Sequence, residues 1–310
     1  MLDQIRGLHH VTSLAHDAAV NNRFFTRTLG LRRIKKTVNF DKPDIYHLYY
    51  GDETGTPGKV MTYFPDPARK RCRHGSGEGG FTRFSVPRGS IEFWRRRLLD
   101  ANVTLHPHTD AFGERQINFI GPDGEDLALV EAPIDDRSAW LAGGVAADRA
   151  IHGFHSVTLR LADAGAMSEL LLFMGYDPVE RHGNIVRYAL ASSNGASIVD
   201  IEMVPDAAEA EQGAGSVHHI AFAVDDRDAQ DEVRAALADA GFKVTPVFDR
   251  DYFSAIYFRA PGGILFEIAT SEPGFDRDED PAELGRNLML PIQHRHLRAV
   301  LEASLQPIED

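Results

Sequence analysis

Residues 7–17 read GLHHVTSLAHD, a segment in which apolar and polar side chains alternate around two adjacent histidines. A helical stretch, AAVNNRFFTRTLG at 18–30, follows it. Asp17 is a suitable N-cap for this helix, and Gly30 stands where a helix commonly ends in a left-handed residue. Three alternating segments, at 33–37, 46–51 and 59–64, have the period of two that is typical of strands packed on one face. The first 65 residues therefore predict a βαβββ unit.

The same order of elements returns after SVHHIAFAVDD at 216–226, which carries a second histidine doublet. Residues 225–241 predict a helix that ends at Gly241, and three predicted strands follow: FKVTPV (242–247), SAIYFR (254–259) and ILFEIA (264–269). Gly30 follows His10 by 20 residues, and Gly241 follows His219 by 22. The two doublets therefore occupy equivalent places in two copies of one unit.

Two weaker copies lie between them. One starts at Phe81, with Ser90 as the expected helix cap, and the other starts near His155, with a helix that ends at Gly175. The sequence thus predicts an α+β protein of four βαβββ units, at about 5–65, 78–133, 151–204 and 215–270, that form two curved-sheet halves with one helix per unit outside. We expect an N-terminal half at 1–145, a C-terminal half at 146–282 and a helical tail at 283–310.

Composition narrows the class of protein. The 310 residues carry a formal net charge of −13, which disfavours nucleic acid or an anionic membrane as a partner. A single cysteine, Cys72, excludes an internal disulfide and a cysteine-rich metal site. No apolar run approaches the length of a membrane span and no targeting pattern begins the chain, so we expect a cytoplasmic enzyme or small-molecule binder.

The histidine doublets predict a metal site. Glu267 lies in a strand that is otherwise apolar, where a carboxylate is costly unless it is paired or binds a metal. Two histidines and one carboxylate are the ligand set of non-haem Fe(II) oxygenases. Because neighbours on a strand point to opposite faces, one histidine per doublet should bind, and counting back from Asp17 and Asp226 selects His10 and His219. The alternative without a metal is a buried salt bridge from Glu267 to Arg259.

The repeated units with HHVT, HHIAFAV and GGILFEIAT resemble the vicinal oxygen chelate (glyoxalase, bleomycin resistance and extradiol dioxygenase) superfamily. RRIKKTVNFDKPDIYHLYYGDETGTPG and DRDYFSAIYFRAPGGILFEIAT resemble, more closely, its ring-cleaving dioxygenases of the hydroquinone type. The resemblance implies one Fe(II), with Mn(II) as the alternative, and a dihydroxylated aromatic substrate that is opened with O₂. A homo-oligomer is compatible with the resemblance. It implies metal ligands at His10, His219 and Glu267, and catalytic groups at His9, Thr12, His218, Arg250 and Tyr257.

Other functions of the same fold stay open. A glyoxalase-type isomerase would usually need a fourth carboxylate ligand, but unit one has Thr62 or Tyr63 at the corresponding place. A binding protein without chemistry would generally lack the full metal triad. Units two and three are expected to be metal-free, although His155, with Asp200 or Glu202 nearby, could replace His10 as a ligand. Five further histidines have no position that suggests a metal ligand, and we expect them to be surface or core residues: His16, His47, His74, His106 and His108.

Overall fold

The computed structural model describes residues 1–107, 111–133 and 137–309. Four units follow one another along the chain. Unit one contains β1 (Leu8–Ala15), α1 (Ala18–Arg23), the π-helical η1 (Phe24–Thr28), β2 (Arg32–Val38), β3 (Tyr46–Gly51) and β4 (Val60–Pro65). Unit two contains β5 (Glu78–Pro87), α2 (Ile91–Asp100), β6 (Gln116–Ile120) and β7 (Asp126–Ala132).

Unit three contains β8 (Gly153–Leu161), α3 (Gly165–Phe173), β9 (Asp177–His182), β10 (Ile185–Ala189) and β11 (Ile198–Met203). Unit four contains β12 (Val217–Val224), α4 (Arg227–Asp239), β13 (Phe248–Asp249), β14 (Phe253–Arg259), the short η2 (Pro261–Gly263) and β15 (Leu265–Pro273). The final segment contains η3 (Phe275–Arg277), η4 (Pro281–Glu283), η5 (Ile292–Leu297) and α5 (Arg298–Ser304). No helix of the described residues is both long and apolar enough to cross a membrane.

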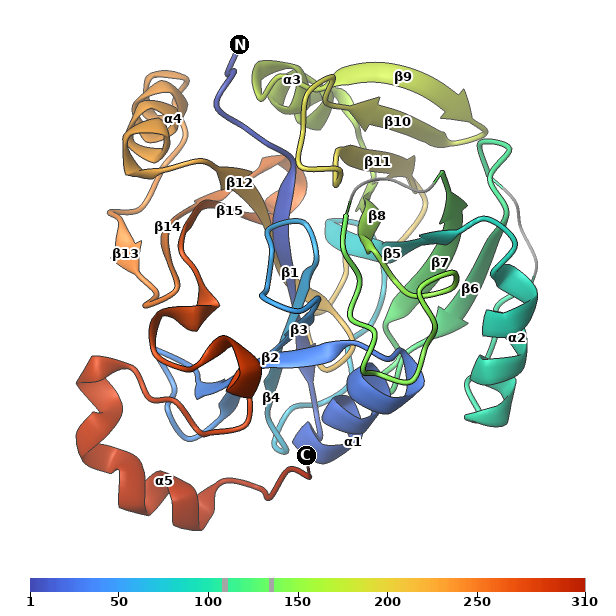
Figure 1. The fold of residues 1–310 in the computed structure, drawn as a ribbon. Coiled ribbons are helices and arrows are strands. Elements are labelled where there is room, and N and C mark those ends of the chain that lie inside the picture. The colour runs from blue at the N-terminus through green and yellow to red at the C-terminus, as the bar shows by residue number, and fades with distance from the viewer. Residues whose placement is uncertain (108–110, 134–136, 310) are drawn as a thin grey trace.

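The strands form two curved sheets that lie side by side (Figure 1). Units one and four share an eight-stranded sheet in the order β13-β14-β15-β12-β1-β4-β3-β2. Units two and three share a seven-stranded sheet in the order β6-β7-β5-β8-β11-β10-β9. In each sheet the first strands of the two units pair antiparallel, β1 with β12 and β5 with β8. The predicted α+β fold of repeated units is confirmed, while the proposed division of the chain at residue 145 stays a prediction.

Each unit has one α-helix after its first strand, as expected, and these helices pack against the sheets through one face. In α4 the buried residues Gln230, Val233 and Leu237 recur at the spacing of a single helix face. Asp17 caps α1, because its carboxylate accepts a hydrogen bond from the Val20 N–H at 2.8 Å. Gly30 has φ of +72°, a conformation that suits glycine after a helix end. The turns between helix and sheet therefore follow directly from the sequence.

The helix expected over 18–30 is present over 18–28, where α1 continues as the π-helical η1. Three other local predictions were wrong. Ser90 does not cap α2 with its side chain, since its hydroxyl donates instead to the Pro87 carbonyl. Glu131 takes over that role by accepting from the N–H groups of Gly89 and Ile91, at 2.9 and 3.1 Å.

The other two errors concern strands. Residues 242–247 form no strand, and only the two residues of β13 pair with β14 at this edge. Pro246 cannot donate to a ladder, which explains the interruption. In the described part of unit two, the strand expected before β6 is reduced to an isolated bridge between Leu105 and Phe119.

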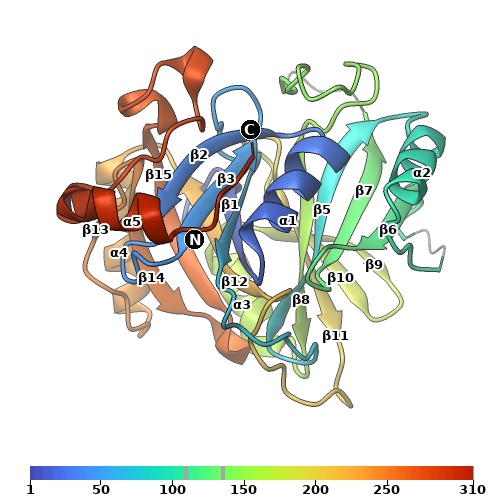
Figure 2. The same cartoon turned by 90° about the horizontal axis from the view of Figure 1, so that it is seen from below.

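The C-terminal segment runs along the outside of the first sheet, near β2 (Figure 2). It is attached through Lys35, whose fully buried ammonium donates to Asp278 at 2.7 Å and to Glu279 at 2.6 Å. The Tyr46 hydroxyl donates to the Gln306 carbonyl at 2.9 Å. Both contacts start from strands of unit one, so the segment is fixed to the sheet that carries both histidine doublets.

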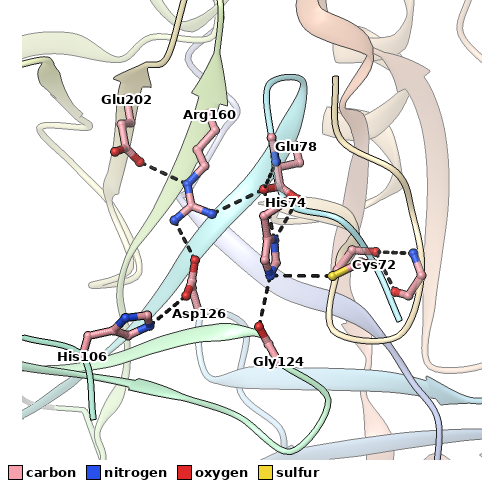
Figure 3. Close-up of polar contacts among 11 residues, drawn as sticks. Cys72, His74, Glu78, His106, Gly124, Asp126, Arg160 and Glu202 are labelled. Atoms are coloured by element: carbon pink, nitrogen blue, oxygen red, sulfur yellow. Dashed lines mark hydrogen bonds and ion pairs between the residues drawn. The ribbon is translucent and has the colours of Figure 1, made fainter. Parts of the chain in front are cut away.

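A polar network ties units two and three together at one end of the second sheet (Figure 3). Arg160 on β8 donates to Glu78, Asp126 and Glu202, which lie on three other strands of that sheet. His74 adds to it: its Nδ1 is 3.1 Å from Glu78 Oε1, and its Nε2 is 3.0 Å from the Gly124 carbonyl. Since both ring nitrogens of His74 face acceptors, the charged imidazolium form is favoured. Contacts with Cys72 Sγ and with Glu78 outweigh burial and raise the pKa of His74 from its ordinary value of 6.5 to about 11.

We predict that His74→Gln lowers the melting temperature by a pH-dependent amount. Protonated His74 stabilises the folded state, so its contribution is complete below pH 6.5, where the unfolded chain is also protonated, and is lost as the pH rises towards about 11. The melting-temperature difference between wild type and His74→Gln should shrink steadily over that range. The exposed His296, replaced in the same way, is the control and should show a small difference at every pH. A difference for His74→Gln that grows with pH would contradict this assignment.

Candidate metal centre

Three side chains from adjacent central strands of the first sheet meet in its interior. His10 lies on β1, His219 on β12 and Glu267 on β15. The Nε2 atoms of the two histidines are 3.2 Å apart, and Glu267 Oε2 is 2.9 Å from His219 Nε2 and 3.6 Å from His10 Nε2. One donor atom from each residue lies within 4.8 Å of the others, a spacing at which all three could hold one metal ion.

Glu267 gives the strongest indication that a cation belongs here. Its side chain is fully buried, and neither carboxylate oxygen has a hydrogen-bond partner among the described residues. Burial alone would raise the pKa of Glu267, but the imidazoles of His10 and His219 hold it well below its usual range. Arg259, the alternative partner, donates instead to the Gly263 carbonyl at 2.9 Å and is exposed. A buried and ionised carboxylate with this surrounding fits a metal ligand.

Hydrogen bonding around His9 fixes which nitrogen of His10 is free. His9 Nε2 is 3.1 Å from the Thr270 carbonyl, which can only accept, so this nitrogen carries the proton. Burial lowers the pKa of His9 to about 3, so the ring is neutral and its Nδ1 is an acceptor. His10 Nδ1, 2.9 Å away, must then donate to it. The lone pair of His10 consequently lies on Nε2, the nitrogen that faces His219 and Glu267.

Two β-bulges explain why both members of each doublet lie near the centre. Between Leu8 and His10, β1 advances two residues while β12 advances one, which makes His9 the extra residue. Between His219 and Val217, β12 advances two residues while β1 advances one, so His218 is extra in the same way. A bulge re-aims side chains and suspends the alternation of faces. His9 and His218 therefore contact the rings of His10 and His219 through their Nδ1 atoms, at 2.9 and 2.7 Å.

The centre opens into a cavity of about 410 Å³. Tyr257 and Arg250, both expected at the site, line it, and the Arg250 Nε donates to the Tyr257 hydroxyl oxygen at 3.2 Å. The Arg250 guanidinium also lies over the ring of Phe40, 5.2 Å from its centre. Burial, and then the charge of Glu267, raise the pKa of Tyr257 well above its ordinary value, so the phenol keeps its proton. Its O–H therefore remains a hydrogen-bond donor at the wall of the cavity.

His47, for which the sequence predicts only a surface or core residue, belongs to the site. His47 lines the cavity, with Nε2 2.8 Å from Thr62 Oγ1 and Nδ1 2.8 Å from the Tyr49 hydroxyl. Thr12 does not line the cavity itself and joins this chain at Thr62, 2.9 Å away. The signal was available, because His47 and Tyr49 alternate on β3 and so share a face. His16, His74 and His106 do not line this cavity, and His108 lies outside the described residues.

The second sheet carries the corresponding position without a comparable centre. Asp200 pairs with Thr158 across the strands as Glu267 pairs with Ala221. Arg187 donates one hydrogen bond to each carboxylate oxygen of Asp200, at 2.9 and 3.1 Å. A guanidinium thus provides the positive charge that Glu267 lacks. His155 pairs with Glu114 at 3.1 Å in this sheet, so the structure brings His10, and not His155, next to His219 and Glu267.

Comparison with known proteins shows the family to which the chain belongs. The family model "Glyoxalase/Bleomycin resistance protein/Dioxygenase superfamily" matches residues 87–268, more than half of the chain. The chain is 40% identical over 312 residues to "Putative ring-cleaving dioxygenase MhqO" of Bacillus subtilis (strain 168), covering 100% of this chain and 98% of that protein. It is 32% identical over 319 residues to "Chlorohydroquinone/hydroquinone 1,2-dioxygenase" of Sphingobium indicum, covering 99% and 97%.

Solved structures agree on the architecture. A crystal structure of a Bacillus subtilis protein that bears a similar dioxygenase description superposes with a TM-score of 0.94 at 40% identity, covering 99% of this chain and 98% of that one. Glyoxalase I from Zea mays superposes with a TM-score of 0.64 at 13% identity, covering 86% and 92%, which shows the shared fold alone. The chain belongs to the glyoxalase/bleomycin resistance protein/dioxygenase superfamily.

Proposed function

We propose that this chain is an Fe(II)-dependent, extradiol-type dioxygenase that opens the ring of a hydroquinone or a catechol with O₂. The observation that carries the proposal is the buried Glu267 carboxylate, which has no hydrogen-bond partner among the described residues and faces two imidazole nitrogens. The hydroquinone dioxygenase among its relatives supports the substrate class.

His10, His219 and Glu267 would hold the metal through two neutral nitrogens and one carboxylate oxygen. Three protein donors leave coordination positions open, and a ferrous ion bound there would supply the one-electron chemistry that allows O₂ to react with an electron-rich ring. Mn(II) accepts the same donors and is the alternative metal.

Tyr257 and Arg250 would orient the substrate. Because Arg250 donates to the Tyr257 oxygen, the Tyr257 O–H can donate to a substrate oxygen. The guanidinium also places positive charge beside the position where a phenolate would lie. A hydroquinone, whose hydroxyls are on opposite corners of the ring, depends on such contacts more than a catechol, which can chelate a metal through both oxygens.

His218 would provide a further proton donor. If the Nδ1 of His219 donates to that of His218 2.7 Å away, the remaining proton of a neutral His218 lies on Nε2. Burial lowers the pKa of His218 to about 3, which favours this neutral form, and His218 lines the cavity. Phe64 and Phe253 form apolar walls that limit the access of water.

The register of the sheet argues against the isomerase alternative. Thr12, two residues after His10, pairs with Thr62. Ala221, two residues after His219, pairs with Glu267 in the same way. Thr62 therefore stands where a fourth carboxylate ligand would come from. A threonine engaged with Thr12 and His47 supplies no negative charge to the centre.

Oxygen consumption tests the function. Protein loaded with Fe(II) under argon should consume one O₂ per ring opened when it is offered a panel of hydroquinones and catechols. Uptake without substrate loss, or isomerisation of a hemithioacetal with no uptake at all, would refute the dioxygenase assignment.

We predict that Glu267→Gln abolishes binding of Fe(II) while the fold is retained, because the substitution removes the balancing charge at nearly constant volume. The measurement is metal content after dialysis, together with circular dichroism. Glu114→Gln is the matched control, since Glu114 is a carboxylate beside a histidine in the second sheet. Equal metal content in wild type and Glu267→Gln would remove Glu267 from the ligand set.

We predict that His9→Ala weakens the metal affinity by about 10- to 100-fold without abolishing it, because His9 holds the tautomer and orientation of His10. His10→Ala should prevent binding altogether. Anaerobic titration with Mn(II) gives both affinities. The reverse order of effects would mean that His9 is the ligand.

We predict that Tyr257→Phe impairs hydroquinone turnover by roughly 5- to 150-fold, the effect of losing a contact of about 1–3 kcal/mol. Catechol turnover should fall less, and metal content should not change. Initial rates of oxygen uptake on both classes, normalised to bound iron, provide the comparison. An equal loss on both classes would contradict the orienting role of Tyr257.

A further inference from the structure

Tyr49 stands in unit one where Tyr257 stands in unit four. On the unit-four side, Tyr257 pairs with Glu267 across the strands, and Glu267 pairs with Ala221. On the unit-one side, Tyr49 pairs with Thr62, and Thr62 pairs with Thr12. Thr12 and Ala221 each follow a candidate metal ligand by two residues, so the two tyrosines are related by the same pseudo-twofold repeat that relates His10 and His219. Both tyrosines line the one cavity.

The Tyr49 phenol is held firmly from behind. Its hydroxyl is 2.8 Å from His47 Nδ1, and the two rings lie 4.0 Å apart, centre to centre. His47 Nε2 is 2.8 Å from Thr62 Oγ1, which is itself 2.9 Å from Thr12 Oγ1. All four side chains are buried. A hydrogen-bond chain of this length fixes the position of the Tyr49 oxygen before any ligand enters.

Counting protons shows that Tyr49 still has one interaction to offer. A neutral imidazole carries one proton, so His47 either donates to the Tyr49 oxygen or accepts from the Tyr49 O–H. In the first case the Tyr49 O–H is free to donate, and in the second a lone pair of its oxygen is free to accept. Either arrangement provides a partner for a hydroxyl group, which both donates and accepts.

We propose that Tyr49 binds the second hydroxyl of a para-dihydroxylated ring whose first hydroxyl is oriented at the metal side by Tyr257 and Arg250, with His47 as the positioning residue that holds Tyr49. The inference rests on the proposed function and names the substrate class within it. The phenols of Tyr49 and Tyr257 come from units one and four and line the same cavity, so each can bind one of the two hydroxyls at opposite corners of a ring. The adjacent oxygens of a catechol leave Tyr49 without a partner, so the Tyr49 contact selects hydroquinones over catechols.

Binding of hydroquinone and of phenol, which lacks the second hydroxyl, tests the proposal. Metal-loaded protein is titrated calorimetrically under argon, where no turnover occurs. The wild type should bind hydroquinone about tenfold more tightly than phenol, the effect of one buried hydrogen bond, and Tyr49→Phe should remove that preference. Tyr50→Phe is the matched control: Tyr50 is an equally buried neighbour whose hydroxyl donates to Asn21 at 3.0 Å, outside the cavity. It should keep the wild-type preference.

A double-mutant cycle tests His47. His47→Ala should lower the preference for hydroquinone in the wild-type background and change nothing in the Tyr49→Phe background, because it acts through Tyr49. A loss of the same size in both backgrounds would refute the positioning role. A wild-type preference that survives in Tyr49→Phe, or that is lost equally in Tyr50→Phe, would overturn the proposal for Tyr49. Oxygen uptake by the wild type separates the two claims: no uptake with any dihydroxylated ring refutes the proposed function, whereas uptake with an unchanged preference in Tyr49→Phe refutes only the role of Tyr49.

Discussion

The charge of Glu267 is the constraint to which the centre of the first sheet is adapted. An ionised carboxylate without hydrogen bonds, fully enclosed by protein, costs several kcal/mol unless a cation accompanies it. Among the described residues no arginine or lysine forms an ion pair with Glu267, whereas the Nε2 atoms of His10 and His219 lie 3.6 and 2.9 Å from its Oε2. The metal proposed for this site would meet both the need for a compensating positive charge and the geometry of the three donor atoms. The bulges at His9 and His218 shape this centre, because each brings a second histidine against the ring of His10 or His219.

Comparison of the four repeated units shows that an unbalanced buried carboxylate occurs at the position of Glu267 in one unit alone. In each unit the last strand pairs parallel to the first strand. The equivalent position on these four last strands holds Thr62, Ala128, Asp200 and Glu267 in turn. Two of them carry no charge, and Arg187 neutralises the third with a pair of hydrogen bonds. Among these four positions, only the carboxylate of Glu267 has no arginine or lysine partner within the described residues. The two sheets share an architecture and differ in how a buried negative charge is balanced.

Much of this arrangement could be predicted from the sequence, because it depends on local and periodic signals. The cap at Asp17, the left-handed Gly30 and the repeat of the doublets locate the units, and the repeat relates His10 to His219. A carboxylate within an apolar strand marks Glu267. Alternation alone, however, would have placed His9 and His218 on the far face, since a bulge depends on the register between β1 and β12 and leaves no trace in either segment by itself.

The remaining errors have a similar origin in contacts between distant segments. Of the two polar partners of His47, Tyr49 is local, but Thr62 is brought to it only by the pairing of β3 with β4, so the local signal alone did not distinguish His47 from any half-buried histidine. The carboxylate of Glu131 caps α2 from forty residues away and leaves Ser90 free to bond to Pro87. The strand expected at 242–247 is different, because its signal was local: Pro246 argues against a strand, and the apolar alternation around it obscured this.

Anomalous X-ray scattering at the iron edge, from crystals loaded with Fe(II) under argon, tests the central claim most directly. The account predicts one peak per chain within bonding distance of His10 Nε2, His219 Nε2 and a Glu267 oxygen, and none beside Asp200. A peak at His155 and Asp200, or a loaded and catalytically active protein with no peak between the two doublets, would contradict it.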